Sequence, residues 1–139
     1  MNSKQFLVLA TSLFGAAAVM ADFDGSEPLM CSFGEAIECD DGAECREVSL
    51  ESIDAPDFVE LDFRKKRIVS VLAGEDGAPD AIDNVVDLAN YLVVQGVQGG
   101  DNNDTLGWSF SISHETGDLV ASASGERAAF VIFGACTPQ

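Results

Sequence analysis

Four cysteines are the residues of this chain whose type and spacing could most readily do chemistry: Cys31, Cys39, Cys45 and Cys136. Zinc knuckles place two cysteines two to four residues apart, whereas "CDDGAEC" has five residues between Cys39 and Cys45, three of them acidic. The sequence contains no C-x-x-C motif, so thioredoxin-like redox chemistry has no support. An even number of cysteines is instead typical of disulfides in an exported chain.

A tight turn indicates how the cysteines pair. The dipeptide Asp-Gly at 41–42 lies between Cys39 and Cys45 and is a strong turn signal, so these two cysteines are expected to form one disulfide. Cys31 and Cys136 would then form the second disulfide, which ties the first strand of the domain to the last. Such a bridge implies that the two ends of the domain are adjacent.

His114 is the only histidine, and a Ser-His-Asp site would have to use it as the base. The chain has no G-x-S-x-G motif, and His114 lies beside a hairpin loop, so a solvent-exposed hairpin histidine is expected. Paired carboxylates could hydrolyse glycosides, but among 24 acidic residues some pair always falls within range. No catalytic residue and no cofactor are predicted, and a hydrolase with an acidic pair is the remote alternative.

The loop "GGDNNDTLG" offers oxygen donors that could hold Ca²⁺, with Asp101, Asn103 and Asp104 as the candidate ligands. The EF-hand template D-x-[DN]-x-[DN]-G-x5-E has no match, and an ordinary acidic turn explains the same residues. A specific metal site is therefore not predicted. A Ca²⁺-binding or salt-adapted structural module is kept as the alternative function.

Arg64, Lys65, Lys66 and Arg67 make up four of the seven basic residues of the chain. They lie at the tip of an expected hairpin, where basic residues are well solvated and protect the edge of a sheet. Two functional interpretations stay open. This turn could contact anions, or it could contact the chain's own acidic loops.

The formal charge is −17, with 24 acidic and 7 basic residues. Nucleic acid is therefore not expected as a partner, because phosphate binding needs clustered Lys and Arg. Anionic membrane surfaces are disfavoured for the same reason. Three explanations of the acidity stay open: solubility of an exported protein, adaptation to salt, or attraction of a cationic partner or Ca²⁺.

The N-terminus predicts export. Lys4 precedes the apolar run "FLVLATSLFGAAAVMA", and small residues precede Asp22, as in a cleaved secretory signal peptide. A membrane anchor agrees less well with this sequence. A spanning helix needs about 20 apolar residues, and this run is shorter and contains Ser, Thr and Gly. We expect a signal peptide at 1–21 and one domain at 22–139, in the periplasm or secreted, without a membrane span.

Most of the remaining chain shows strand patterns. Residues 105–114 alternate best, because Leu106, Trp108, Phe110 and Ile112 share one face and serines occupy the other. Core packing is the expected role of Trp108. Further strands are expected at 28–37, 45–53, 57–63, 67–73, 90–98, 118–124 and 127–136.

Residues 74–84 indicate a loop, because Gly, Asp and Pro recur there. The apolar spacing that follows allows one short helix near 80–89, or a loop that enters the strand at 90–98. The predicted fold is all-β: a compact antiparallel barrel or sandwich of about seven to eight short strands. Parallel βαβ units would require more helices than the sequence offers.

The chain begins, after its signal peptide, with C…C-x5-C and ends with "GWSFSISHETGDL" and "FGAC". This arrangement resembles small exported β-rich proteins of unknown function from Gram-negative bacteria. The resemblance implies a periplasmic or secreted single domain with a terminal disulfide, and it transfers no catalytic residue. We expect a non-enzymatic binding or structural protein of the cell envelope, whose partner is a cationic protein or a small ligand.

Overall fold

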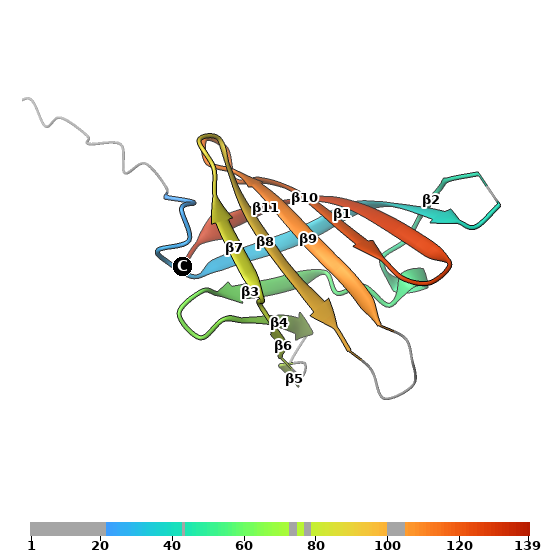
Figure 1. Cartoon of the computed structure of the whole chain (residues 1–139), viewed down its shortest axis with the longest axis horizontal. Helices are drawn as coiled ribbons and strands as arrows, with labels where there is room; N and C mark the ends of the chain where they lie inside the picture. Colours follow the sequence, from blue (N-terminus) through green and yellow to red (C-terminus); the bar gives the residue numbers. More distant parts are fainter. Residues whose placement is uncertain (1–21, 43, 73–74, 77–78, 100–104) are drawn as a thin grey trace, which may run out of the picture.

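A computed structural model describes residues 22–42, 44–72, 75–76, 79–99 and 105–139 of the chain. The expected signal peptide at 1–21 lies outside these residues. The described part is all-β and antiparallel, as predicted, and its strands form one curled sheet in the shape of a half-barrel (Figure 1). The strands are β1 (Leu29–Asp40), β2 (Arg46–Val48), β3 (Phe58–Asp62), β4 (Arg67–Leu72), β5 (Glu75–Asp76), β6 (Asp80–Ala81), β7 (Asn84–Asp87), β8 (Tyr91–Gln98), β9 (Leu106–Ser113), β10 (Asp118–Ser124) and β11 (Ala128–Pro138).

The order of the strands follows the chain except at one point. The sheet runs β5-β4-β3-β1-β11-β10-β9-β8-β7, so the first and last long strands are neighbours in its middle. The described residues form eleven strands, more than the seven to eight expected, because the short strands β5, β6 and β7 occupy a segment that was expected to be a loop or a helix. The sheet is continuous, which decides against a sandwich of two packed sheets.

The short helix considered near 80–89 is not formed. Residues 80–81 pair with β4, and residues 84–87 pair with β8, so this segment is extended. The backbone N–H of Ile82 also donates to the carbonyl of Lys66, and that of Asp83 donates to the carbonyl of Gln95. Pairing with two strands, together with the β-branched Val85 and Val86, outweighs the helical spacing of the apolar residues.

The segment expected as a strand at 45–53 also differs from the prediction. Only 46–48 form a strand, and a 3₁₀ turn, η1 (Glu51–Ile53), follows. The Ser49 hydroxyl accepts a hydrogen bond from the Ser52 backbone N–H at 3.2 Å, and the Ser52 hydroxyl donates to the Ser49 carbonyl at 2.7 Å. These local bonds compete with the sheet, as serine side chains often do.

The core fills the end of the half-barrel at which the described chain begins and ends. The backbone N–H of Gln139 donates to the carbonyl of Pro28 at 3.0 Å, which places the chain ends side by side. Phe23 is buried there against Gly117, whose φ of +74° and contact with Phe23 leave no room for a side chain. The largest fully buried side chains are Leu29, Leu61, Leu92, Ile112, Leu119, Val94 and Cys31.

Both expected disulfides are present. Cys31 and Cys136 are directly paired residues of β1 and β11, both buried, and their bond joins positions 105 apart in the chain. Cys39 and Cys45 close the turn between β1 and β2. The two bonds account for all four cysteines, which is consistent with an oxidising environment.

Candidate functional site

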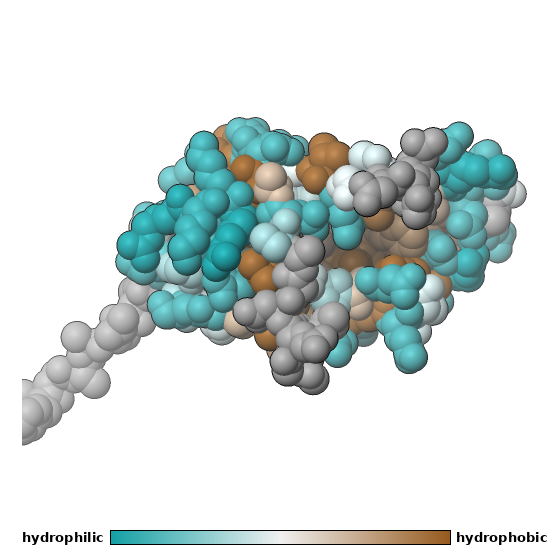
Figure 2. All heavy atoms as spheres, turned by 90° about the horizontal axis from the view of Figure 1, so that it is seen from below, coloured by the Kyte–Doolittle hydropathy of each residue, from teal (hydrophilic) through white to brown (hydrophobic). Residues whose placement is uncertain are grey.

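The interior of the half-barrel is not filled along its whole length. A cavity of about 170 Å³ lies at the end away from the chain termini, between η1, the end of β8, and the starts of β9 and β11. Seen from below in Figure 2, apolar side chains are visible in a hollow between hydrophilic ones. The volume resembles that of a cavity of about 150 Å³ that binds benzene in another protein.

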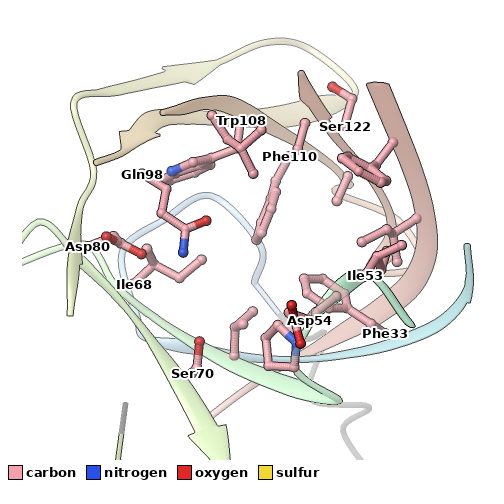
Figure 3. Close-up of a pocket in the computed structure, with 18 residues that line it drawn as sticks. Phe33, Ile53, Asp54, Ile68, Ser70, Asp80, Gln98, Trp108, Phe110 and Ser122 are labelled. Atoms are coloured by element: carbon pink, nitrogen blue, oxygen red, sulfur yellow. The ribbon is translucent and has the colours of Figure 1, made fainter. Parts of the chain in front are cut away.

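Three aromatic side chains form the deepest wall of the cavity. Phe110 is 5% exposed, and its ring meets that of Phe33 edge to face, with centroids 5.7 Å apart. The Trp108 ring lies 5.2 Å from that of Phe110. Figure 3 shows Phe110 pointing into the centre of the cavity with Trp108 above it. The alternation in 105–114 therefore places Trp108 on the inner face as predicted, where it packs against the core and also lines the cavity.

Gly96 makes the position of Trp108 possible. A β-carbon at this position would overlap the Trp108 indole and lie 2.5 Å from the carbonyl oxygen of Ala81. A larger residue in β8 would therefore push the indole, or the backbone of β6, away from the sheet. The glycine allows the extended segment at 80–87 to pass close to β8 beside the cavity.

Small side chains opposite the aromatic residues leave the space open. Ala121 and Ala123 of β10 are paired with Phe110 and Trp108, and both line the cavity. Ser70 of β4 lines it from the other side. Larger residues at these three positions would fill the interior, as the leucines do at the other end. The alternation of the strands directs these side chains inward, and the cavity results because they are small.

A few polar groups interrupt the apolar wall. Figure 3 shows Asp80 and Gln98 on one wall and Asp54 on another. Burial raises the pKa of the Asp80 carboxyl above its usual value, because a charged carboxylate is poorly solvated there. Gln98 occupies an inward position of β8, after Leu92, Val94 and Gly96. A mainly apolar pocket with a few polar groups is the usual composition of a site for a small molecule.

Sequence reasoning did not place Asp80 and Gln98 at a cavity, although Asp80 is one of the oxygen donors of the acidic segment 73–83 that could be considered for Ca²⁺. Asp80 falls in a segment that indicates a loop, and no sequence pattern connects it with Trp108. For Gln98 a signal exists, because it is a polar residue at the next inward position of β8. A polar side chain at an inward position is the feature that could have indicated a cavity.

The sequence leaves two interpretations open for the basic turn at 64–67, contact with anions or contact with the chain's own acidic loops. Arg64 and Lys66 are exposed at this turn, and Lys66 has a φ of +50°. Lys65 Nζ lies 3.1 Å from Asp62 Oδ2, and Arg67 Nε lies 3.8 Å from the same oxygen. Two of the four basic side chains therefore contact an acidic residue of the chain itself.

Asp62 is the buried carboxylate of this turn, at 5% exposure. Its Oδ1 accepts a hydrogen bond from the Lys65 backbone N–H at 3.0 Å. The pKa of the Asp62 carboxyl lies below its usual value, although burial opposes the shift. The causes are this backbone hydrogen bond, the hydrogen bond and charge of the Lys65 side chain, and the charge of Arg67. Asp62 thus stabilises the turn in its ionised form.

We expect Asp62→Asn to lower the free energy of unfolding at neutral pH and to flatten its loss in acid. A carboxyl whose pKa is depressed on folding contributes stability above its unfolded pKa of about 3.9, and this is lost as pH falls through the folded pKa. Urea unfolding between about pH 2 and pH 7 measures the effect. Asp57→Asn, which removes an exposed carboxylate, is the control, and equal pH dependence in both variants would contradict the assignment.

His114 is partly covered, not fully solvent-exposed as expected. Its Nε2 lies 3.2 Å from Asp87 Oδ1, and a quarter of the side chain is exposed (25%). Its backbone N–H donates to the carbonyl of Asn90. These contacts connect the end of β9 with the hairpin between β7 and β8. They lie away from the cavity, so His114 is not part of the candidate site.

The Ca²⁺ candidates Asp101, Asn103 and Asp104 lie outside the described residues. Within the described ranges, no three His, Cys, Asp or Glu side chains come together in a way that could hold a metal ion. The same part of the chain contains no helix with the length and apolar character needed to cross a membrane.

Comparisons with known proteins add no relative: no family model matches the chain, and neither does any curated protein or solved structure. The fold and the cavity therefore provide the basis for a functional proposal.

Proposed function

We propose that this protein is an exported, non-enzymatic binding protein of the cell envelope that holds a small, largely apolar molecule in the cavity beside Trp108. The observation that carries the proposal is the cavity of about 170 Å³, which lies on the inner face of the half-barrel beside a core of buried apolar side chains. Empty apolar volume destabilises a fold, by roughly 24 cal/mol per Å³ in large-to-small substitutions. A cavity retained at that cost is explained by a bound molecule.

Location outside the cytoplasm forms part of the proposal. The two disulfides support it, because thiols stay reduced in most cytosolic proteins. The sequence of residues 1–21 supports it independently. We therefore propose a periplasmic or secreted protein, as in the β-rich proteins of Gram-negative bacteria that the sequence resembles.

Binding is favoured over hydrolysis by the composition of the wall. Asp54 and Asp80 both line the cavity, and the raised pKa of Asp80 would suit a general acid. A glycoside substrate, however, presents a ring of hydroxyl groups, each of which needs a hydrogen-bonding partner once it leaves water. The aromatic and aliphatic side chains around Phe110 offer few such partners.

Ethylbenzene in a sealed cuvette is the first probe, because Trp108 is the only tryptophan and its emission reports directly on the cavity. We expect saturable changes in Trp108 emission with a Kd of about 1 mM or tighter. This Kd corresponds to a binding free energy of roughly 4 kcal/mol for the eight carbon atoms of ethylbenzene. A rise in melting temperature at the same concentrations gives a second measurement.

A matched pair of variants separates cavity binding from surface binding. Ala123→Leu adds volume inside the cavity, and Ala129→Leu adds the same volume on the exposed outer face of β11. We expect the first to weaken ethylbenzene binding at least about tenfold and the second to leave it unchanged. Unsaturable binding, or equal affinities in the two variants, would overturn the proposed function.

A further inference from the structure

The charges around the cavity limit what kind of molecule it can hold. The described residues that line it include two carboxylates, Asp54 and Asp80, and no basic side chain. In the sequence, the segments 73–78, before Asp80, and 100–104, after Gln98, contain no Lys, Arg or His. An anionic ligand would therefore meet only negative or neutral groups, within a chain whose formal charge is −17.

Asp80 is held beside the cavity by sheet pairing. It lies opposite Ile68, a buried residue of β4, and the neighbouring Ala81 lies opposite Arg67. Arg67 does not neutralise Asp80 in the structure, because its Nε is within ion-pair distance of Asp62 instead. Among the described residues, no side chain donates a hydrogen bond or an ion pair to the Asp80 carboxylate. A partly buried carboxylate without a counter-charge is costly, and a bound cation would remove that cost.

We infer that the ligand is an arylalkylammonium ion, whose protonated amine contacts Asp80 while its aromatic ring lies against Phe110 and Phe33. The inference rests on the proposed function and specifies its ligand class. Figure 3 shows the Gln98 amide between Trp108 and Ile68, on the same wall as Asp80. Its oxygen can accept a second hydrogen bond from the ammonium group.

The size and composition of the cavity agree with this class. A volume near 170 Å³ accommodates one aromatic ring with a short chain, by comparison with the benzene-binding cavity of similar size. Edge-to-face packing, as between Phe33 and Phe110, is available to the ligand ring. A charge-assisted hydrogen bond at Asp80 is about twice as strong as a neutral one, and the face of Trp108 also attracts cations.

Three probes of nearly equal shape test the inference: 2-phenylethylamine, 2-phenylethanol and 3-phenylpropionate. Each is titrated against the oxidised protein at neutral pH in about 150 mM NaCl, where the Debye length is near 8 Å. Trp108 emission and calorimetry give the affinities. We expect the amine to bind about tenfold or more tightly than the alcohol, and the carboxylate to bind more weakly than the alcohol.

Two aspartate variants locate the charge that matters. Asp80→Asn keeps the shape of the side chain and removes the charge inside the cavity, and Asp83→Asn removes an exposed charge three residues further on. We expect Asp80→Asn to reduce the affinity for the amine to the level of the affinity for the alcohol. The affinity for the alcohol itself should not change. Asp83→Asn should leave all three affinities unchanged. Melting curves of both variants confirm folding, and Asp80→Asn should melt no lower than the natural protein at neutral pH.

Each outcome decides between the two proposals. If 2-phenylethanol and the amine bind equally well, or if both aspartate variants weaken the amine equally, the inferred ligand class is wrong while apolar binding stands. If none of the three probes binds and ethylbenzene also fails, the proposed function is wrong, and the inferred ligand class is overturned with it.

Discussion

Replacing both Cys31 and Cys136 by alanine should lower the free energy of unfolding by about 5 kcal/mol, the largest effect that we expect from any change in this protein. The bond joins residues 105 apart, so its loss frees almost the whole domain in the unfolded chain. A domain of this size has a total stability of only about 5–15 kcal/mol, so the variant should be partly unfolded at physiological temperature. Urea unfolding of the oxidised proteins measures the difference.

The second disulfide is the internal control. Replacing Cys39 and Cys45 by alanine opens a loop that joins residues only 6 apart, for which the same model gives roughly 2.5 kcal/mol. That turn projects from the sheet and takes no part in the core, so the cavity should be unaffected. If the two double variants lose equal stability, loop length is not what determines the contribution of the bonds.

Phe110→Ala should cost about 3–5 kcal/mol, the range for removing a buried aromatic ring from a core. The ring is 5% exposed, contacts Phe33 and Trp108, and separates the filled end of the half-barrel from the cavity. Its removal should also enlarge the cavity. The affinity for bulkier aromatic molecules should therefore rise relative to the affinity for ethylbenzene. Thermal and urea unfolding measure the first effect, and Trp108 emission the second.

Phe133→Ala removes the same ring from the outer face of β11, where the side chain is 41% exposed. A surface substitution of this kind is usually within about 0.5 kcal/mol of neutral. A loss in Phe133→Ala as large as that in Phe110→Ala would mean that the outer face is covered by something, for example a second copy of the chain. Sedimentation of the natural protein would then distinguish a dimer from a monomer.

The sequence was sufficient for the long strands because their alternation is local. In 106–113 each inward position is apolar and each outward position is small or polar, so the two faces of β9 follow from the pattern alone. The cysteine pairing followed from a similar local feature, the turn between Cys39 and Cys45. Residues 80–87 lack such a pattern, and their strand exists because β4 and β8 lie on either side of them.

The cavity could not be predicted in the same way. Alternation shows that Trp108 and Ala123 point inward, but not whether the facing side chains meet across the interior. That depends on the curl of the sheet and on the sizes of residues from five or more strands, which are distant in the chain. Asp80 illustrates the limit, because it lines the cavity together with side chains such as Trp108 and Ile132, which are distant in the sequence.

The placement of the chain ends beside each other at the filled end, opposite the cavity, has a practical consequence. The bond between Gln139 and Pro28 holds that end together, while the hollow opens around η1 and Gln98. A tether attached at either end of residues 22–139 would therefore leave the mouth of the cavity facing away from the attachment point. Immobilised on a surface through one end, the domain would act as a sensor whose single indole reports on the captured molecule without an added dye.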